Sequence, residues 1–149
     1  MITNYTWDDM KWDVRTIVDQ IKKNGVNYDY VCGIGRGGLI PAVWLSHKLM
    51  APLITLRCQK RNNEKLSYYD CSDEVQEILS DPKNKVLMVD DIMDSGETAD
   101  LIENEVYEKF DWACLIYNKS QPHPCKYYGT MIDREKDKEW VNFWWERIE

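Results

Sequence analysis

The sequence lacks the features that mark several large classes of protein. Its five Cys are an odd number and form no Cys-x-x-Cys pair, which argues against a disulfide framework or a zinc site. No apolar run approaches the roughly 20 residues of a membrane-spanning helix. The N-terminus has no basic start followed by an apolar segment, as a signal peptide would. These absences predict a soluble, cytoplasmic protein with reduced thiols.

An excess of positive charge is also lacking, since 19 Lys and Arg stand against 26 Asp and Glu, for a net charge of -7. Nucleic acids and anionic membranes attract clustered Lys and Arg, so neither is expected as a partner. A small phosphorylated ligand needs only a local pocket of donors and is not excluded. The length of 149 residues, without repeat or linker, predicts a single domain over residues 1–149.

Helical and strand-like segments alternate along the chain. Apolar residues recur every three or four positions from Trp7 to Ile21, which predicts a helix with Thr6 as its N-cap and Asn24-Gly25 as its end. Further helices are predicted at 39–50, 75–79 and 99–110, and strands at 28–34, 53–56, 86–89, 112–117, 127–132 and 140–145. The alternation predicts an α/β fold, in which helices cover both faces of a mostly parallel twisted sheet. Ligands of such sheets bind at the carboxyl ends of the strands.

The stretch 86–99 carries the most chemical information. An apolar strand ends in two adjacent carboxylates, Asp90 and Asp91, and the chain then turns through Ser95-Gly96 into a helix. The backbone N–H groups of residues 94–98 are expected to point outward at the positive end of that helix, with the hydroxyls of Ser95 and Thr98 as further donors. This pattern predicts a phosphate site beside carboxylates. The alternative is a strand that ends in two acids and a helix with an ordinary cap.

A glycine-rich turn at residues 33–38, Gly33-Ile34-Gly35-Arg36-Gly37-Gly38, also ends a predicted strand and opens a helix. Such a turn offers free N–H groups and one guanidinium to an anion. Taken alone, it equally fits a tight turn in which glycine supplies a positive φ.

These motifs together resemble those of the type I phosphoribosyltransferases. Residues 86–98 are similar to the family's phosphoribosyl-pyrophosphate (PRPP) motif. They consist of an apolar strand, two acids, two apolar residues, Asp94 and then Ser-Gly-Glu-Thr. The glycine turn is similar to its pyrophosphate loop, most of all to that of the bacterial xanthine-guanine enzymes, where the peptide before the Arg is often cis. Residues 116–119 resemble a strand whose Lys contacts the purine 6-oxo group, and Trp140-Val141 resembles the purine hood. The resemblance extends over almost the whole chain.

The resemblance implies a type I phosphoribosyltransferase fold and a Mg²⁺-dependent transfer of the 5-phosphoribosyl group from PRPP to a 6-oxopurine, with release of pyrophosphate, in purine salvage. It implies that Asp94 is the general base, and that Asp90 and Asp91 engage the ribose hydroxyls directly or through Mg²⁺. The other implied contacts are Arg36, Gly37 and Gly38 to pyrophosphate, Ser95, Gly96, Glu97 and Thr98 to the 5′-phosphate, and Lys119, Trp140 and Val141 to the purine. The implied partners are PRPP, pyrophosphate, a purine base and its nucleotide, within a homodimer or homotetramer.

Some features depart from the family pattern. The polar segment 57–69 is expected to be a loop within a flexible lid of about residues 57–74, and about residues 120–149 to form a small hood. The family's Ser-Tyr pair comes about ten residues late, at Ser67-Tyr68, so Arg61 and Lys65 are assigned to pyrophosphate only loosely. Asn142 replaces an acid, which leaves the preferred purine open.

Two other functions remain open. One is a PRPP- or nucleotide-binding regulatory protein of the same fold, and the other is a phosphoribosyltransferase with a different base acceptor. The combination of Asp94, Lys119 and Trp140 favours catalysis on a 6-oxopurine, because a sensor needs no residue that accepts a proton from a base.

Overall fold

A six-stranded sheet forms the centre of the molecule. The computed structural model describes residues 2–60, 66–138 and 140–147. In this part of the chain the strand order is β4-β3-β2-β5-β6-β7, and only β3 and β4 pair antiparallel. The strands are β2 (Tyr30–Gly35), β3 (Leu53–Lys60), β4 (Leu66–Asp70), β5 (Val86–Met93), β6 (Asp111–Asn118) and β7 (Tyr127–Ile132). The predicted α/β fold with a mostly parallel sheet is confirmed.

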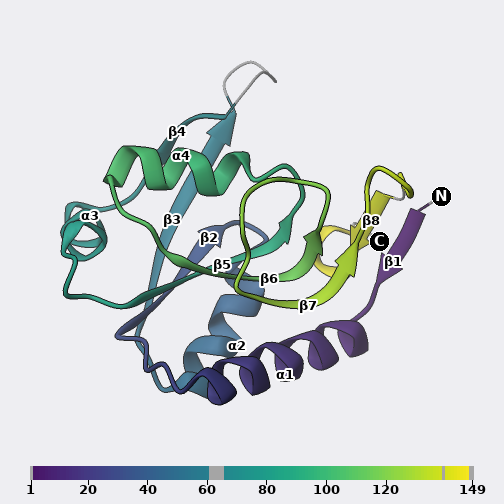
Figure 1. The fold of residues 1–149 in the computed structure, drawn as a ribbon, viewed down its shortest axis with the longest axis horizontal. Helices are drawn as coiled ribbons and strands as arrows, with labels where there is room; N and C mark the ends of the chain where they lie inside the picture. Colours follow the sequence, from purple (N-terminus) through teal and green to yellow (C-terminus); the bar gives the residue numbers. More distant parts are fainter. Residues whose placement is uncertain (1, 61–65, 139, 148–149) are drawn as a thin grey trace.

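Helices cover both faces of this sheet, as Figure 1 shows. Helices α1 (Trp7–Asn24) and α2 (Leu39–Leu49) lie on one face, and α3 (Asp73–Ser80) and α4 (Glu97–Val106) lie on the other. The predicted start of α1 is confirmed, because Thr6 Oγ1 accepts from Asp9 N at 3.2 Å while Asp9 Oδ2 accepts from Thr6 N at 2.8 Å. Gly25, with φ of 66°, ends the helix as predicted.

The two faces of the sheet bury separate apolar clusters. Met10, Ile17, Leu45, Leu87 and Leu115 belong to the cluster under α1 and α2. Leu79, Met88, Ile102, Trp112 and Cys114 belong to the cluster under α3 and α4. Strand β6 contributes to both clusters, which explains its nearly continuous apolar sequence. Among the described residues, no helix is long and apolar enough to cross a membrane.

A small second sheet stands beside the carboxyl end of β7 (Figure 1). It pairs β1 (Ile2–Tyr5) in parallel with β8 (Trp140–Phe143), and a 3-10 turn, Trp144–Glu146, follows. We call this sheet and turn the hood. Strand β1 was not predicted from the sequence, and the predicted strand 140–145 ends early, at Phe143. The rings of Tyr5, Phe143 and Trp145 pack at centroid distances of 4.7 to 6.3 Å and join the hood to the core.

The polar segment 57–69 was predicted as a loop, but its described residues, 57–60 and 66–69, lie in strands. Strand β3 continues through Lys60, and β4 begins at Leu66 and returns antiparallel to it. Arg57 Nη2 lies 2.8 Å from Asp70 Oδ2, so an ion pair joins the two strands. An antiparallel pair at the edge of a sheet can leave one face to solvent, so its sequence need not show the apolar pattern that predicts a buried strand.

Two other boundaries differ near the predicted phosphate site. Strand β5 continues to Met93, so Asp90 and Asp91 lie inside the strand and not beyond its end. Helix α4 begins at Glu97 and ends at Val106, two residues earlier at its start and four at its end than predicted.

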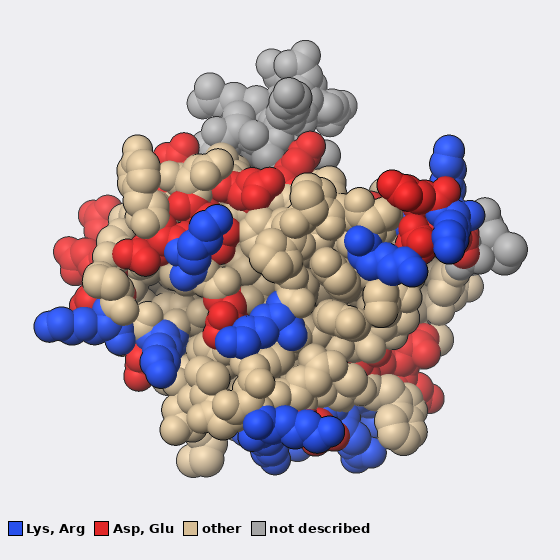
Figure 2. Space-filling view, viewed as in Figure 1, with Lys and Arg blue, Asp and Glu red and all other residues tan. Residues whose placement is uncertain are grey.

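Charge is unevenly distributed over the surface. Figure 2 shows Lys and Arg gathered along the lower edge, where α1 lies, and many Asp and Glu at the upper left, over α3 and α4. A groove between α1 and α2 is lined by Lys11, Arg15, Lys22 and Lys48, with Asp19 as its only acid. The net charge of -7 therefore coexists with local regions of positive charge.

Candidate active site

The two predicted anion-binding turns come together at the carboxyl ends of β2 and β5. A Cβ atom on Gly38 would lie 2.6 Å from the carbonyl oxygens of both Ile34 and Val89, and one on Gly37 would lie 1.9 Å from Asp91 Oδ2. Only glycine fits at position 38, because a side chain would collide with strand backbone, and at position 37 a side chain would displace the carboxylate of Asp91. The Gly35–Arg36 peptide is cis, as the resemblance implied, and Arg36 is exposed beside the turn.

The acid pair is held by short local hydrogen bonds. Asp91 N donates to Asp90 Oδ1 at 2.9 Å, and Ile92 N donates to Asp91 Oδ1 at 2.7 Å. Burial, reinforced by the neighbouring charge of Asp91, raises the pKa of Asp90 well above its ordinary value, and burial also raises the pKa of Asp91. A cation bound beside the two carboxylates would offset both their loss of hydration and the repulsion between them.

The acid pair fits Mg²⁺ better than a metal that the protein encloses fully. Within residues 2–60, 66–138 and 140–147, no group of three or more His, Cys, Asp or Glu could surround an ion. Mg²⁺ usually takes one or two protein carboxylates and fills the rest of its shell with water and substrate oxygens. Asp90 and Asp91 could therefore hold Mg²⁺ only together with an oxygen-rich ligand.

Residues 94–98, here called the phosphate loop, lead from β5 into α4. Gly96 has φ of 81° and forms the N-cap without a side-chain bond, and Asp100 N donates to Gly96 O at 3.0 Å. The N–H groups before Asp100 therefore have no intrahelical partner and lie at the positive end of the helix. Glu97 N lies 3.3 Å from Ser95 Oγ. A cavity of about 180 Å³ opens here, lined by Asp90, residues 92–99 and Trp112.

Asp94 is held between two residues to which sequence reasoning gave no role. Its Oδ1 accepts from Arg134 Nε at 3.1 Å and from Asn118 Nδ2 at 3.3 Å, and Asn118 Nδ2 also donates to Asp94 O at 2.8 Å. The Asp94 side chain is 45% exposed, so a ligand can still reach it. Asn118 could have been suspected because it directly precedes Lys119. Arg134 lies in a charged turn, and its sequence resembles that of an ordinary solvent-exposed segment.

The residues assigned to the purine are only partly brought together. Lys119, at the end of β6, lies near Asp94 through its neighbour Asn118, and its Nζ is 3.6 Å from Asp133 Oδ2. Trp140 is 66% exposed on β8, whereas Val141 is buried in the hood. A cavity of about 490 Å³ beneath the hood is lined by Val141, Arg134 and Asp133, but Lys119 and Trp140 do not line it.

The cations predicted for the lid contribute little to the described site. Arg57 is paired with Asp70, and Arg61 and Lys65 lie outside the described residues. Of the side chains predicted to bind pyrophosphate, Arg36 lies in the described structure, exposed beside Gly37 and Gly38.

Comparison with known proteins gives the family. The model of the phosphoribosyl transferase domain matches residues 5–146. The chain belongs to this family. It is accordingly a glycosyltransferase-type enzyme with the type I phosphoribosyltransferase fold, as the resemblance implied. A curated relative, the xanthine-guanine phosphoribosyltransferase of Cereibacter sphaeroides, is 27% identical over 145 residues, which cover 95% of this chain and 84% of the relative.

Solved structures support the same fold over the full length. The purine phosphoribosyltransferase of Pyrococcus horikoshii aligns with a TM-score of 0.71 and 25% identity over 99% of this chain and 95% of its own. A hypothetical protein of Neisseria gonorrhoeae, solved with bound ppGpp, aligns with a TM-score of 0.76 and 24% identity over 100% of this chain and 92% of its own. The latter likeness concerns the fold alone.

Proposed function

We propose that this phosphoribosyltransferase transfers the 5-phosphoribosyl group of PRPP to a 6-oxopurine (hypoxanthine, guanine or xanthine) and releases pyrophosphate, in purine salvage. The observation that supports it best is the convergence of three subsites at one edge of the sheet. These are the phosphate loop, the acid pair Asp90-Asp91 and the turn at Gly37-Gly38. The purine-specific relatives named above favour the same class of base.

The proposed roles follow from the positions of the groups. The N–H groups of the phosphate loop, with the hydroxyls of Ser95 and Thr98, hold the 5′-phosphate. Asp90 and Asp91 engage the ribose hydroxyls, and their negative charge stabilises the ribosyl cation that develops in the transition state. Arg36 and the amides of the Gly37-Gly38 turn bind the leaving pyrophosphate. Mg²⁺, when bound with the donor at Asp90 and Asp91, supplies positive charge that neutralises the phosphates.

The base side of the reaction is assigned to Asp94, Lys119, Trp140 and Val141. The bond between the ribose C1 and the pyrophosphate oxygen breaks with its electron pair on pyrophosphate, and the N9 lone pair of the purine forms the new bond. The N7 proton of the purine passes to Asp94, which must lie within hydrogen-bond reach. Lys119 contacts the 6-oxo group, Trp140 stacks on the ring, and the backbone at Val141 reads the 2-position.

An assay of pyrophosphate release tests this proposal. The protein is incubated with PRPP, Mg²⁺ and each candidate base in turn, and release with a 6-oxopurine but not with a pyrimidine is expected. The variant Asp94→Asn should lower kcat by about 10²- to 10⁴-fold, the usual range for the loss of a general base, while KM for PRPP changes little. Unchanged turnover would remove Asp94 from the mechanism.

A second candidate function is a nucleotide-binding regulatory protein of the same fold. The ion pair between Arg134 and Asp94 favours it, because this cation competes with a purine for the proposed base. The ppGpp bound to the Neisseria gonorrhoeae protein gives one example of a regulatory nucleotide on this fold. Tight nucleotide binding without pyrophosphate release from any base would support the sensor over the transferase.

We also propose that two copies of the chain associate. Several large apolar side chains are exposed on or beside α1 and α2, among them Trp12 at 65% and Met50 at 92% exposure. Large apolar side chains that stay exposed in a monomer often mark a protein interface. A homodimer or homotetramer by analytical ultracentrifugation, converted to monomer by Trp12→Glu, is the expected result.

A further inference from the structure

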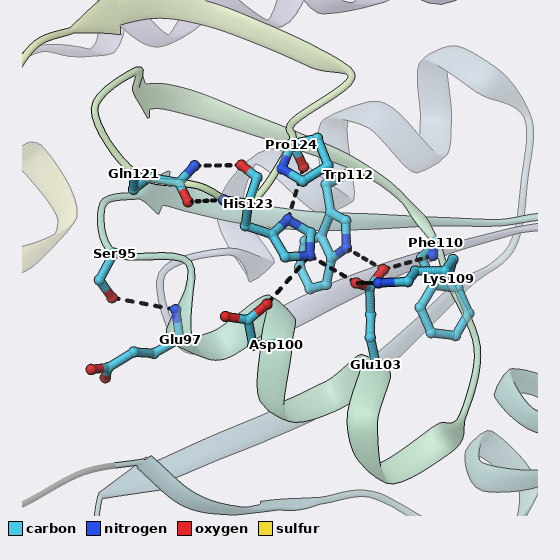
Figure 3. Close-up of polar contacts among 10 residues, drawn as sticks. All are labelled: Ser95, Glu97, Asp100, Glu103, Lys109, Phe110, Trp112, Gln121, His123 and Pro124. Atoms are coloured by element: carbon cyan, nitrogen blue, oxygen red, sulfur yellow. Dashed lines mark hydrogen bonds and ion pairs between the residues drawn. The ribbon is translucent and has the colours of Figure 1, made fainter.

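A second polar cluster lies against the phosphate loop, between helix α4 and the loop that follows β6. Figure 3 shows the His123 ring pointing from that loop toward Asp100 and Glu103 on α4. His123 Nε2 lies 2.7 Å from Glu103 Oε1 and 3.9 Å from Asp100 Oδ1, and His123 Nδ1 lies 2.9 Å from Pro124 O. Each ring nitrogen therefore has an oxygen partner.

The pair of His123 and Glu103 is buried and closely held. The two residues are only 7% and 6% exposed. Glu103 Oε2 accepts from Phe110 N at 2.8 Å and from Trp112 Nε1 at 3.3 Å, and Lys109 Nζ lies 3.8 Å from Oε1. A buried polar pair of this kind is stable only when its hydrogen bonds are satisfied, and then it fixes the elements that carry it. Here it fixes the loop after β6 on α4.

The same loop packs directly against the phosphate loop. A Cβ atom on Gly96 would lie 2.6 Å from Gln121 Oε1 and 2.8 Å from His123 Cβ. Gln121 is itself fixed, since its Nε2 donates to His123 O and its Oε1 accepts from His123 N, each at 2.6 Å. Gly96, in its left-handed conformation, therefore packs directly against Gln121 and His123.

Two further contacts connect the cluster to the ligand cavity and to the base side. Trp112, which donates to Glu103, also lines the cavity of about 180 Å³ at the phosphate loop. Asn118, at the start of the loop that carries Gln121 and His123, donates to Asp94 O at 2.8 Å. Lys119 lies between these two anchors. This loop therefore contacts the phosphate loop at two places, Asp94 and Gly96.

We propose that Glu103, His123 and Gln121 are positioning residues that hold the phosphate loop in its anion-binding conformation and couple it to the Lys119 side of the site. This inference rests on the proposed function, because it takes a sugar 5-phosphate as the ligand of the phosphate loop. The polar atoms of the three side chains bond within the cluster, so they act through Gly96. Fixing a loop before binding removes the entropic cost of ordering it, and this raises ligand affinity.

The unmodified protein offers a direct test by NMR. The chain has only two His, and His47, exposed on α2, serves as an internal control that His47→Gln assigns. Ribose 5-phosphate is titrated into the protein and its binding is followed by calorimetry. The ring resonances of His123 should shift as the site fills, while those of His47 should not. Binding without any response of His123 would falsify the coupling, and absence of binding contradicts both this inference and the proposed function.

Variants test the positioning role separately. Glu103→Gln and His123→Gln should raise the Kd for ribose 5-phosphate and the KM for PRPP about tenfold, the factor that corresponds to losing one hydrogen bond that orders the phosphate loop before binding. The kcat per folded enzyme should change much less, and His47→Gln should change nothing. A purely structural role predicts a lower Tm with Kd and KM unchanged, and that result overturns the inference. If both variants fail to fold, Gln121→Ala gives the same comparison with a smaller loss of structure.

The inference and the proposed function can fail independently. If ribose 5-phosphate binds, His123 responds and the variants weaken binding, but no base releases pyrophosphate, the positioning role stands and the transferase function does not. If the wild type releases pyrophosphate with a purine and the variants retain its Kd and KM, only the positioning role is wrong.

Discussion

Asp90 is a residue of the candidate site that lowers the stability of the fold at neutral pH. Burial raises the pKa of Asp90 well above its ordinary value of 3.8, so the folded state holds that proton more tightly than the unfolded state does. The contribution of Asp90 to the free energy of unfolding is therefore largest at acidic pH, and it falls as the pH rises from about 3.8 through the raised pKa. At neutral pH the Asp90 carboxylate destabilises the fold.

Replacing Asp90 by Asn should therefore stabilise the protein while it removes function. Asp90→Asn keeps an acceptor for Asp91 N and discards the buried charge, and we expect a gain of about 1 kcal/mol in the free energy of unfolding at pH 7. The gain should shrink toward pH 4, and Mg²⁺-dependent PRPP binding should be lost. Urea denaturation at a series of pH values measures the difference in the free energy of unfolding between the variant and the wild type. A variant less stable than the wild type at pH 7 would contradict the account.

Asn118 joins three segments of the site through one side chain. Its amide donates to Asp94, while its Oδ1 accepts from Ser120 N, Ser120 Oγ and Arg134 N at 2.6 to 3.2 Å. Asn118→Ala removes all of these hydrogen bonds from partly buried groups and should cost about 1–3 kcal/mol of stability, together with most of the turnover. Ser120→Ala, which removes only one hydroxyl, should cost less than half as much. Equal losses in thermal denaturation of the two variants would rule out this role.

At the scale of elements, the turn after β2 depends on its close approach to β5. Gly38→Ala places a methyl group against the carbonyl oxygens of Ile34 and Val89, which belong to two central strands and cannot move apart cheaply. We expect a loss of about 2–3 kcal/mol by chemical denaturation, within the range for overpacking a core. Gly35→Ala is the matched control, because its nearest contact, Leu56 O, would be at 3.4 Å. Similar stabilities of the two variants would contradict this explanation.

The elements that the sequence predicted well are those whose signal is local. The capping box of α1 and the apolar runs of β5 and β6 lie within single short segments, and all three elements were expected. The β3–β4 hairpin and β1 were not. Strand β1 has only four residues, and its partner β8 is 138 positions away, from Ile2 to Trp140. No local pattern reports so distant a pairing, because the burial that stabilises it comes from the partner.

The site shows the same difference between groups that are close in the sequence and groups that only the fold brings together. Asp90, Asp91 and the phosphate loop follow one another in a single segment, so their proximity could be predicted. The partners of Asp94 and Glu103 could not, because Arg134 is 40 positions from Asp94 and His123 is 20 from Glu103. Charged residues in loops resemble solvated residues until the fold brings them against a buried group. Sequence alone therefore indicated the candidate ligand-binding residues more readily than the residues that contact them.

At the scale of the whole molecule, the carboxylate of Asp13 links the hood to the main sheet. Tyr5 Oη donates to Asp13 Oδ2 at 2.5 Å, and Thr130 Oγ1 donates to Asp13 Oδ1 at 2.8 Å. These bonds join β1, α1 and β7. Burial raises the pKa of Asp13 despite both hydrogen bonds, and burial together with the bond to Asp13 raises the pKa of Tyr5. The ring of Tyr5 packs on Phe143 at 5.1 Å, next to the strand segment that carries Trp140 and Val141.

Loosening this attachment should weaken the base side of the site and spare the phosphate side. Tyr5→Ala removes a buried ring and should cost about 3–5 kcal/mol of stability, whereas Tyr5→Phe keeps the ring and should cost about 1 kcal/mol. If Trp140 and Val141 bind the purine, Tyr5→Ala should raise KM for the purine well beyond KM for PRPP, measured below its Tm. The Kd for ribose 5-phosphate should stay near that of the wild type. An equal rise in both KM values would mean that the hood does not act on the base alone.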